Sequence, residues 1–175
     1  MKKTIFYLVG NYGVGKSSII KEPILSKRKN LIEIRNNLFV LGEDINGADS
    51  LSSQKKDDVI KQIILNRDKN IIIAGIYYTT IKDIKLLSKY FNIVLFYLKT
   101  SFEENAKRIA LRGKLINVET YNAKLTSQLS LIKNTKGFRK LFIIENDRPL
   151  EEVKAEIYKI IEDETNRTNT DRTQL

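Results

Sequence analysis

The sequence predicts an α/β fold, in which helices flank a doubly wound sheet of five parallel strands. Three observations support this fold class. Five short apolar runs of strand length recur along the 175 residues. Segments with helical periodicity or polar character separate these runs, as crossovers between parallel strands require. The first run leads through a glycine-rich turn into a helix. The length is that of one domain, expected at residues 1–164, before a disordered polar tail at 165–175.

The first strand is expected at Ile5–Val9, and it runs into a turn with the spacing G-x-x-x-x-G-K-S. The glycines of this turn permit backbone angles that a Cβ disfavours, so successive N–H groups can point at phosphate oxygens. A helix follows from Lys16 to about Ile20, before Pro23, and its N-terminal end favours anions. The pattern is that of a P-loop, in which Lys16 reaches the β- and γ-phosphates of a nucleotide and Ser17 ligates Mg²⁺. The residues expected to bind the nucleotide here are Gly10, Asn11, Tyr12, Gly13, Val14, Gly15, Lys16, Ser17 and Ser18.

A second strand region is expected at Leu31–Arg35. The turn Asn36-Asn37 and a return at Leu38–Leu41 follow it, a pattern consistent with a hairpin. The loop 42–50 then holds two glycines and three acids. A serine at position 52 or 53 is expected to N-cap the next helix, which extends through Asn66.

The second half of the chain alternates apolar strands with helices in the same way. Its expected elements are strand Asn70–Ala74 ending at Gly75, helix Ile81–Tyr90, strand Ile93–Leu98, helix Phe102–Arg112, a helix around Leu125, Leu129 and Ile132, strand Leu141–Ile144, the loop Asn146–Pro149 and helix Leu150–Glu162. Ligands of such sheets bind where parallel strands end. We therefore expect the P-loop, Asp44, Asp49, the segment Gly75–Thr80 and the helix carrying Arg108 to converge at one edge.

The composition excludes several classes of site. The chain has no cysteine and no histidine, so disulfides, Cys-based redox or metal sites and a histidine base are excluded. Its apolar runs are too short to span a membrane, and its first residues lead into a strand and not into a signal peptide. We therefore expect a cytoplasmic protein. The net charge of +10 is explained either by a lysine-rich solvated surface or by a polyanionic partner such as nucleic acid.

Two classes of P-loop protein require motifs that this chain lacks. A GTPase switch needs N-K-x-D, which is absent, and a motor-type ATPase needs a carboxylate where the third strand instead runs into Gly75-Ile76. A small kinase remains, in which Arg108 and Arg112 would stabilise the transferring phosphoryl group near a mobile lid. The alternative for this pair is a solvated helix surface paired with Glu103 and Glu104.

The chain resembles the nucleoside-monophosphate-kinase-like group of P-loop kinases over roughly residues 5–161. The resemblance rests on Gly10–Ser17, on Arg108 and Arg112 in the run Arg-Ile-Ala-Leu-Arg, and on the loop Asn146–Pro149 before the last helix. It implies the strand order 2-3-1-4-5, a small helical lid at about residues 113–140, and ATP with Mg²⁺ as cofactors. It also implies that the adenine lies against the last loop, with contacts from Asn146, Arg148, Pro149 and Arg108.

Within this group, Leu41-Gly42 and the run Gly47-Ala48-Asp49-Ser50-Leu51-Ser52 look like phage kinases that phosphorylate 5-hydroxymethyluracil in DNA. That resemblance implies that the phosphoryl acceptor is a hydroxymethyl group in DNA. It also implies that the chain, as a phage protein, is located in the host cytoplasm. Without histidine, Asp49 or Asp44 is the candidate base for an alcohol acceptor, and Asp44 is also a candidate Mg²⁺ ligand. Each carboxylate has a structural alternative, as a helix cap or a turn residue. The other functions left open are a deoxynucleoside-monophosphate kinase, a polynucleotide 5′-hydroxyl kinase and a non-catalytic ATP-binding module.

Overall fold

The computed structural model describes residues 2–11, 13–20, 31–41, 44–45, 48–49, 55–76 and 78–170. For residues 32, 44, 45, 48, 49 and 168–170 it describes the backbone alone. Tyr12, Pro23, most of the loop 42–52 and the end of the tail, 171–175, lie outside the described residues.

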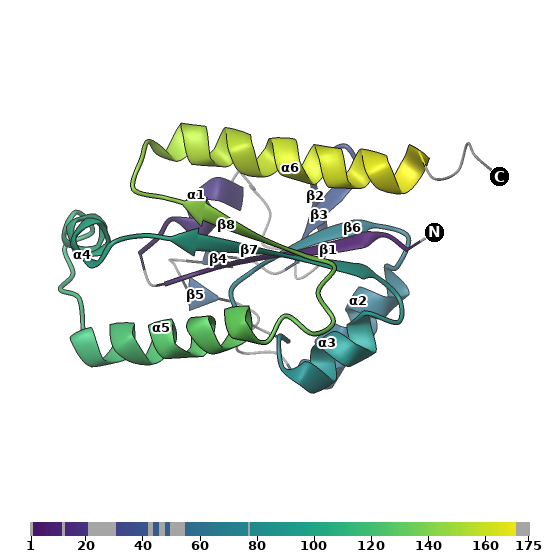
Figure 1. The fold of residues 1–175 in the computed structure, drawn as a ribbon, viewed down its shortest axis with the longest axis horizontal. Helices are drawn as coiled ribbons and strands as arrows, with labels where there is room; N and C mark the ends of the chain where they lie inside the picture. Colours follow the sequence, from purple (N-terminus) through teal and green to yellow (C-terminus); the bar gives the residue numbers. More distant parts are fainter. Residues whose placement is uncertain are drawn as a thin grey trace.

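A six-stranded sheet forms the centre of the fold (Figure 1). Its strands are, in spatial order, β2 (Ile32–Arg35), β3 (Leu38–Val40), β6 (Asn70–Ala74), β1 (Thr4–Gly10), β7 (Asn92–Lys99) and β8 (Lys140–Glu145). The five strands from β3 to β8 run parallel, and they take the predicted order 2-3-1-4-5 when β3 counts as the second strand.

The sixth strand, β2, corrects the expectation of a five-stranded sheet. It pairs antiparallel with β3 at the edge, so the run predicted as the second parallel strand is the outer arm of a hairpin. Asn37 closes the turn with a φ of 63°, a left-handed conformation that asparagine tolerates better than most residues. The return strand, and not the outgoing one, therefore joins the parallel sheet.

Alternate residues of β1 supply two separate cores. Ile5, Tyr7 and Val9 belong to one, Phe6 and Leu8 to the other, and all five are 0% exposed. A strand buried on both faces reads as one continuous apolar run, which is why its position is evident in the sequence. The helices α2 (Lys56–Leu65), α3 (Ile81–Leu87) and α5 (Val118–Lys133) pack on the first core, while α1 (Lys16–Ile20) and α6 (Leu150–Thr170) pack on the second (Figure 1).

The helix α4 (Phe102–Ala110) ends earlier than predicted. Ser101 caps its start, since the Ser101 hydroxyl accepts a hydrogen bond from the Glu104 N–H. At the other end Gly113 turns the chain with a φ of +68°. Arg112 therefore lies beyond the helix, and the prediction that it shares one helix face with Arg108 is wrong.

Two further helix boundaries differ from prediction. The helix α2 begins after Lys55, which makes no side-chain cap, so the predicted serine cap is wrong. The helix α6 continues to Thr170, so the predicted helix end at Glu162 is wrong. Its longer course has a physical reason, because Ile161 and Glu164 stay buried and Glu164 pairs with Lys140 of β8 at 2.5 Å. In the described part of the chain, no helix combines the length and apolarity needed to cross a membrane.

Candidate phosphate-binding site

The carboxyl ends of β1, β6 and β8 bring three chain segments to one edge of the sheet. β1 ends at Gly10 and enters the P-loop, while the other two strands lead to Gly75 and Asn146. Backbone hydrogen bonds hold both segments to neighbouring strands, from Gly75 N–H to the Leu8 carbonyl at 2.9 Å and from Asn146 N–H to the Lys99 carbonyl at 2.8 Å. The expected convergence is thus present for the P-loop and for the segment after β6.

The glycines of the P-loop are needed for two different reasons. Gly13 and Gly15 have φ values of +83° and +88°, in the left-handed region that other residues adopt at a cost. At Gly10 the reason is packing, because a Cβ there would lie 2.8 Å from Val14 Cγ2. A Cβ on Gly13 would in addition lie 2.8 Å from Ile109 Cγ1 in α4. The loop is therefore shaped by α4 as well as by its own glycines.

The ammonium group of Lys16 lies against the P-loop backbone. Its Nζ donates hydrogen bonds to the carbonyl oxygens of Gly10 at 2.9 Å and Asn11 at 3.0 Å. Ser17 and Ser18 follow it in the first turn of α1, and both are half-buried. The positive charge is thus held at the loop, where an anion with stronger acceptor oxygens would compete for it.

The carbonyl oxygen of Val14 is anchored by side chains from two distant elements. Asn146 Nδ2 donates to it at 2.8 Å, and Arg108 Nη1 donates to it at 3.3 Å. Asn146 is fully buried, and its Nδ2 also donates to Thr100 Oγ1 at 3.0 Å. These bonds tie the middle of the P-loop to the ends of β7 and β8.

The two arginines that the sequence treats alike have different surroundings. Arg108 is 19% exposed and donates from Nε to Glu104 Oε1 at 2.8 Å and from Nη2 to the Asn146 carbonyl at 2.7 Å. It therefore joins α4, the P-loop and the loop after β8, and one of its bonds is the ion pair with Glu104 expected for a surface role. Arg112 is exposed beyond the end of α4.

The helix α5 contacts the P-loop through Asn11. Asn11 is buried, and its Nδ2 donates to the Tyr121 carbonyl at 3.1 Å. The Tyr121 ring meets Phe102 of α4 edge-on, with 5.1 Å between ring centroids. The link from α4 to α5, by contrast, carries Leu111 and Leu115 at 80% and 94% exposure. Within the region predicted as a lid, the helix is packed and the link is exposed, and the lid function itself remains a prediction.

The loop Asn146–Pro149 is held by its own side chains. The Asp147 carboxylate accepts hydrogen bonds from Ser101 N–H at 3.0 and 3.2 Å. The Arg148 guanidinium pairs with Glu156 of α6, and Pro149 is exposed at the start of that helix. The predicted contacts of Asn146, Arg148 and Pro149 with adenine remain a prediction.

The candidate acids Asp44 and Asp49 lie opposite each other in a small hairpin. β4 (Asp44–Ile45) pairs antiparallel with β5 (Ala48–Asp49), and Asp44 and Asp49 are backbone partners. Partners of this kind have Cα atoms about 4.5–5.5 Å apart. The predicted loop is wrong at these four residues, and the Asn-Gly dipeptide at positions 46–47 is itself a strong hairpin signal. The described side chains form no group of three or more Asp, Glu, His or Cys that could hold a metal ion.

A strained residue lies after the carboxyl end of β6. Tyr78 has a φ of 59°, which costs a residue with a side chain roughly 1–2 kcal/mol. Its carbonyl accepts a hydrogen bond from the Tyr7 hydroxyl at 3.2 Å, inside the core. Burial, together with the nearby charge of Asp83, raises the pKa of Tyr7 well above its ordinary value. The neutral phenol therefore helps to hold the segment after β6 in its strained form.

Sequence reasoning missed three of these contacts, namely Asn11 with Tyr121, Asn146 with Val14, and Tyr7 with Tyr78. Their partners are 110, 132 and 71 positions apart in the chain. No local pattern connects residues at such separations. The one local signal is at position 11, where an asparagine comes directly after the fully buried strand β1 and an apolar context leaves its amide in need of partners.

At the carboxyl edge of the doubly wound parallel sheet, a strand leads through a glycine-rich loop into a helix, and a lysine is held over the loop. This arrangement defines the P-loop class of α/β proteins. No protein-family model and no curated protein matches the chain in sequence.

Solved structures of the same fold do match. A gluconokinase from Sinorhizobium meliloti 1021 aligns with a TM-score of 0.54 at 16% identity, over 96% of this chain and 97% of that one. A shikimate kinase from Acinetobacter baumannii in complex with shikimate has a TM-score of 0.52 at 15% identity, over 93% and 94%. A deoxyadenosine kinase from M. mycoides, with the products dCMP and dCDP, has a TM-score of 0.50 at 15% identity, over 91% and 98%. At these identities the likeness shows that the chain has the fold of these proteins.

Proposed function

We propose that the chain is a P-loop kinase, which uses ATP and Mg²⁺ to transfer the γ-phosphoryl group to an acceptor beside the P-loop. The observation that carries this proposal is the position of Lys16, whose ammonium is bound to the carbonyls of the loop itself. A lysine held at the loop keeps a positive charge close to the phosphates, where negative charge develops during transfer. The anchoring of Val14 by Asn146 and Arg108 supports the same function, because it keeps the loop in one shape.

The residues of the site take distinct roles in this reaction. The backbone at Gly13 and Gly15 presents N–H groups to the phosphates. Lys16 moves from the loop carbonyls to the β- and γ-phosphate oxygens, which are stronger acceptors. Arg112, exposed just beyond α4, extends over the transferring phosphoryl group, while Arg108 positions the loop and contacts the nucleotide.

The residues present fit a Mg²⁺ ion that is bound together with the nucleotide. Mg²⁺ usually takes one or two protein ligands and completes its octahedron with phosphate oxygens and water. Ser17 would supply one ligand, with Asp44 as the second candidate, and this fits a chain whose described side chains form no three-residue metal cluster. When bound, the ion would neutralise charge on the β- and γ-phosphates.

We propose a hydroxyl group as the acceptor, with Asp49 as its general base. The names gluconokinase, shikimate kinase and deoxyadenosine kinase all denote hydroxyl-bearing acceptors, which supports an alcohol. An alcohol benefits from a carboxylate that takes its proton, and the chain has no histidine for this role. The pairing of Asp49 with Asp44 places two candidate bases next to each other in the hairpin after β3.

The specific acceptor that we propose is the hydroxymethyl group of 5-hydroxymethyluracil in DNA. It is supported by the likeness of Leu41-Gly42 and Gly47–Ser52 to phage kinases with this activity, and by the net charge of +10. A deoxynucleoside-monophosphate kinase or a polynucleotide 5′-hydroxyl kinase is the second candidate, since both share the P-loop chemistry.

The test is incubation with γ-labelled ATP and a panel of acceptors. The panel contains DNA with 5-hydroxymethyluracil, the same DNA with thymine, free deoxynucleoside monophosphates, and an oligonucleotide with a 5′-hydroxyl. We expect label only on the modified DNA, and we expect Asp49→Asn to abolish it while ATP still binds. Label on the free monophosphates or on the 5′ end would replace this acceptor by the second candidate, and transfer to nothing with ATP bound would support the non-catalytic module.

A further inference from the structure

Basic residues precede four of the five parallel strands. Because parallel strands start at the same side of a sheet, the fold collects these residues at the amino edge of the sheet. We call this set the basic edge, and its members are Lys2 and Lys3 before β1, Arg67 and Lys69 before β6, Lys89 before β7, and Lys136 and Arg139 before β8. In the sequence they form only short separate runs, so no basic stripe is visible there.

Backbone contacts confirm that these segments lie side by side. The Asn92 N–H, at the start of β7, donates to the Lys3 carbonyl at 2.8 Å, and the Arg139 N–H donates to the Ile93 carbonyl at 2.7 Å. Lys2 Nζ donates to the Ser88 carbonyl at 2.6 Å. The start of β1 is therefore joined to the start of β7, and the start of β7 to that of β8.

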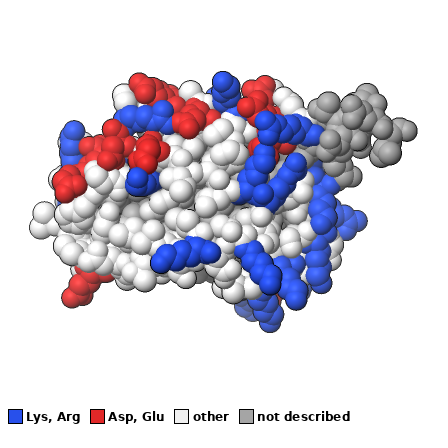
Figure 2. All heavy atoms as spheres, in the orientation of Figure 1, with Lys and Arg blue, Asp and Glu red and all other residues white. Residues whose placement is uncertain are grey.

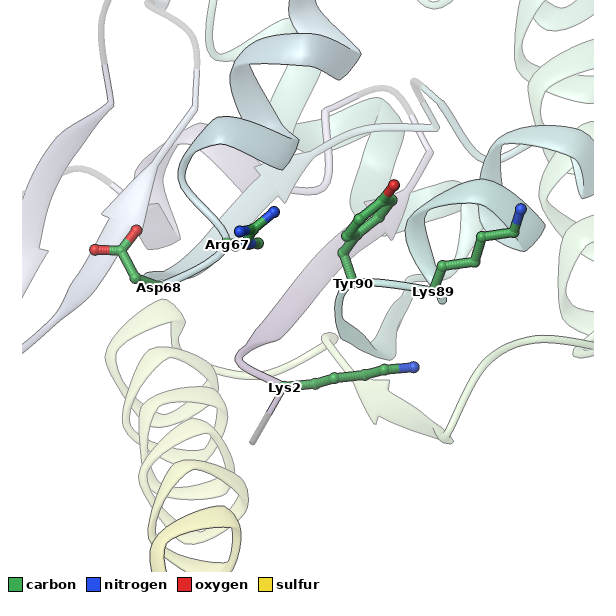
Figure 3. Close-up of a pocket in the computed structure, with 5 residues that line it drawn as sticks. All are labelled: Lys2, Arg67, Asp68, Lys89 and Tyr90. Carbon is green, nitrogen blue, oxygen red and sulfur yellow. The ribbon is translucent and has the colours of Figure 1, made fainter.

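The basic edge contains a hollow of about 510 Å³ (Figure 3). It is lined by Lys2, Arg67, Asp68, Lys89 and Tyr90. Figure 3 shows the three cationic side chains and the tyrosine ring arranged around it, with Asp68 at the margin beyond Arg67. Three positive charges thus surround one half-buried aromatic ring, with a single carboxylate at the side.

Among the described residues, no salt bridge neutralises the basic edge, although Lys2 and Lys69 donate hydrogen bonds to the uncharged oxygens of Ser88 and Asn66. Figure 2 shows Lys and Arg gathered over the end of the molecule where β1 begins, whereas most of the acidic residues in this view lie toward the other end. The positive field is therefore concentrated at one end and not spread evenly.

The basic edge and the P-loop lie at opposite ends of β1. That strand has seven residues, so it separates them by about 20 Å at the usual rise of about 3.3 Å per residue. A ligand held on the P-loop would therefore leave the basic edge uncovered.

We propose that the basic edge binds the backbone of a single-stranded nucleic acid, with Tyr90 stacking against a base. Four strands at about 4.8 Å spacing make an edge of about 15 Å, which is long enough to contact more than one phosphate of a nucleic-acid backbone. Cations along a groove with an aromatic ring inside it form the arrangement that holds single strands without sequence preference. An anionic membrane is an alternative polyanionic partner, but a flat membrane surface would leave the hollow empty and would make no contact with Tyr90.

The test is fluorescence anisotropy with a fluorescein-labelled 15-nucleotide oligo(dT), titrated with the full chain at several salt concentrations. The variant is Lys2→Glu/Arg67→Glu/Lys89→Glu, and its matched control is Lys82→Glu/Lys154→Glu/Lys159→Glu. Each replaces three positive by three negative charges and lowers the net charge by six, from +10 to +4. We expect at least about tenfold weaker binding in the variant, a salt slope reduced by about 2, and less than about threefold loss in the control.

Two controls separate binding at the basic edge from a loss of folding and from binding at the P-loop. Thermal unfolding of both triple variants, and the milder Lys2→Ala/Arg67→Ala/Lys89→Ala, distinguishes lost binding from lost folding. Saturating Mg·ATP should leave the oligonucleotide bound, because its site is at the other end of β1. The proposal would be overturned if the variant and the control lost oligonucleotide affinity equally, or if ATP displaced the oligonucleotide. It would also be overturned if the basic edge bound phosphatidylserine vesicles while the chain did not bind the oligonucleotide.

Discussion

Arg108→Ala and Arg112→Ala should have different effects, although the two residues are four positions apart in one motif. Arg108 donates to Glu104, to the Asn146 carbonyl and to the Val14 carbonyl of the P-loop. Arg112 is exposed beyond the end of α4. We therefore expect Arg108→Ala to weaken the fold and the P-loop together, and Arg112→Ala to change catalysis alone.

The contacts of Arg108 set the size of the effect. Its bonds of 2.8 Å to Glu104 and 2.7 Å to Asn146 come from a charged donor, and such bonds contribute about 1.5–3 kcal/mol each when buried. The bond to Val14 is long, at 3.3 Å, and Glu104 is 28% exposed, so solvent screens part of the sum. We expect Arg108→Ala to lower the free energy of unfolding by about 2–4 kcal/mol, and Arg112→Ala by less than about 0.5 kcal/mol.

Urea unfolding measures the stability of both variants, and calorimetric titration with Mg·ATP measures their affinity. Arg108→Ala should lose ATP affinity as well as stability, whereas Arg112→Ala should keep both and lose kcat. Glu104→Gln is the control that removes one charge partner of Arg108 and leaves its two bonds to backbone carbonyls, so it should cost less than Arg108→Ala.

An unchanged unfolding free energy in Arg108→Ala would refute the positioning role. If that variant also kept its ATP affinity and lost only turnover, Arg108 would act on the transferring phosphoryl group alone. A loss of stability in Arg112→Ala as large as that in Arg108→Ala would contradict the surroundings assigned to Arg112.

Three further variants test the packing of the site. Asn146→Ala should cost about 2–4 kcal/mol of unfolding free energy, because two hydrogen bonds of a fully buried amide are lost, and urea unfolding checks this. Gly13→Ala should weaken ATP binding, as titration would show, since its φ of +83° and the contact with Ile109 both oppose a Cβ. Burial raises the pKa of Tyr7 in the folded state, so the free energy of unfolding should fall as the pH rises above about 10, where the tyrosine ionises more readily in the unfolded chain. Tyr7→Phe should reduce this fall at alkaline pH, as a series of unfolding curves at different pH values would show.

Much of the fold is predictable because its signals are local. β6 begins and ends where the apolar run Asn70–Ala74 predicts, and α1 begins at Lys16, at the end of the glycine pattern. A strand buried on both faces is largely apolar, so its limits are evident in the sequence. The same holds for the P-loop, where Gly13 and Gly15 are required by the backbone angles.

The remaining features depend on contacts that are distant in sequence. The local pattern ends α6 at Glu162 and not at Thr170, because Glu164 looks like a solvated helix residue until Lys140 of β8 is beside it. The separate surroundings of Arg108 and Arg112 depend on where α4 ends, and helix ends are weakly encoded. The basic edge has no local signal at all, since it exists only once the starts of the parallel strands lie side by side.

Lys16→Ala tests the central claim most directly, with γ-phosphoryl transfer and Mg·ATP binding measured on the same preparation as the wild type. The side chain donates to two loop carbonyls and is not part of either core, so the fold should persist. We expect transfer to fall by about a hundredfold or more while thermal unfolding stays near the wild-type value. Wild-type transfer by Lys16→Ala, or wild-type protein that binds no Mg·ATP, would contradict a phosphotransferase built on this P-loop.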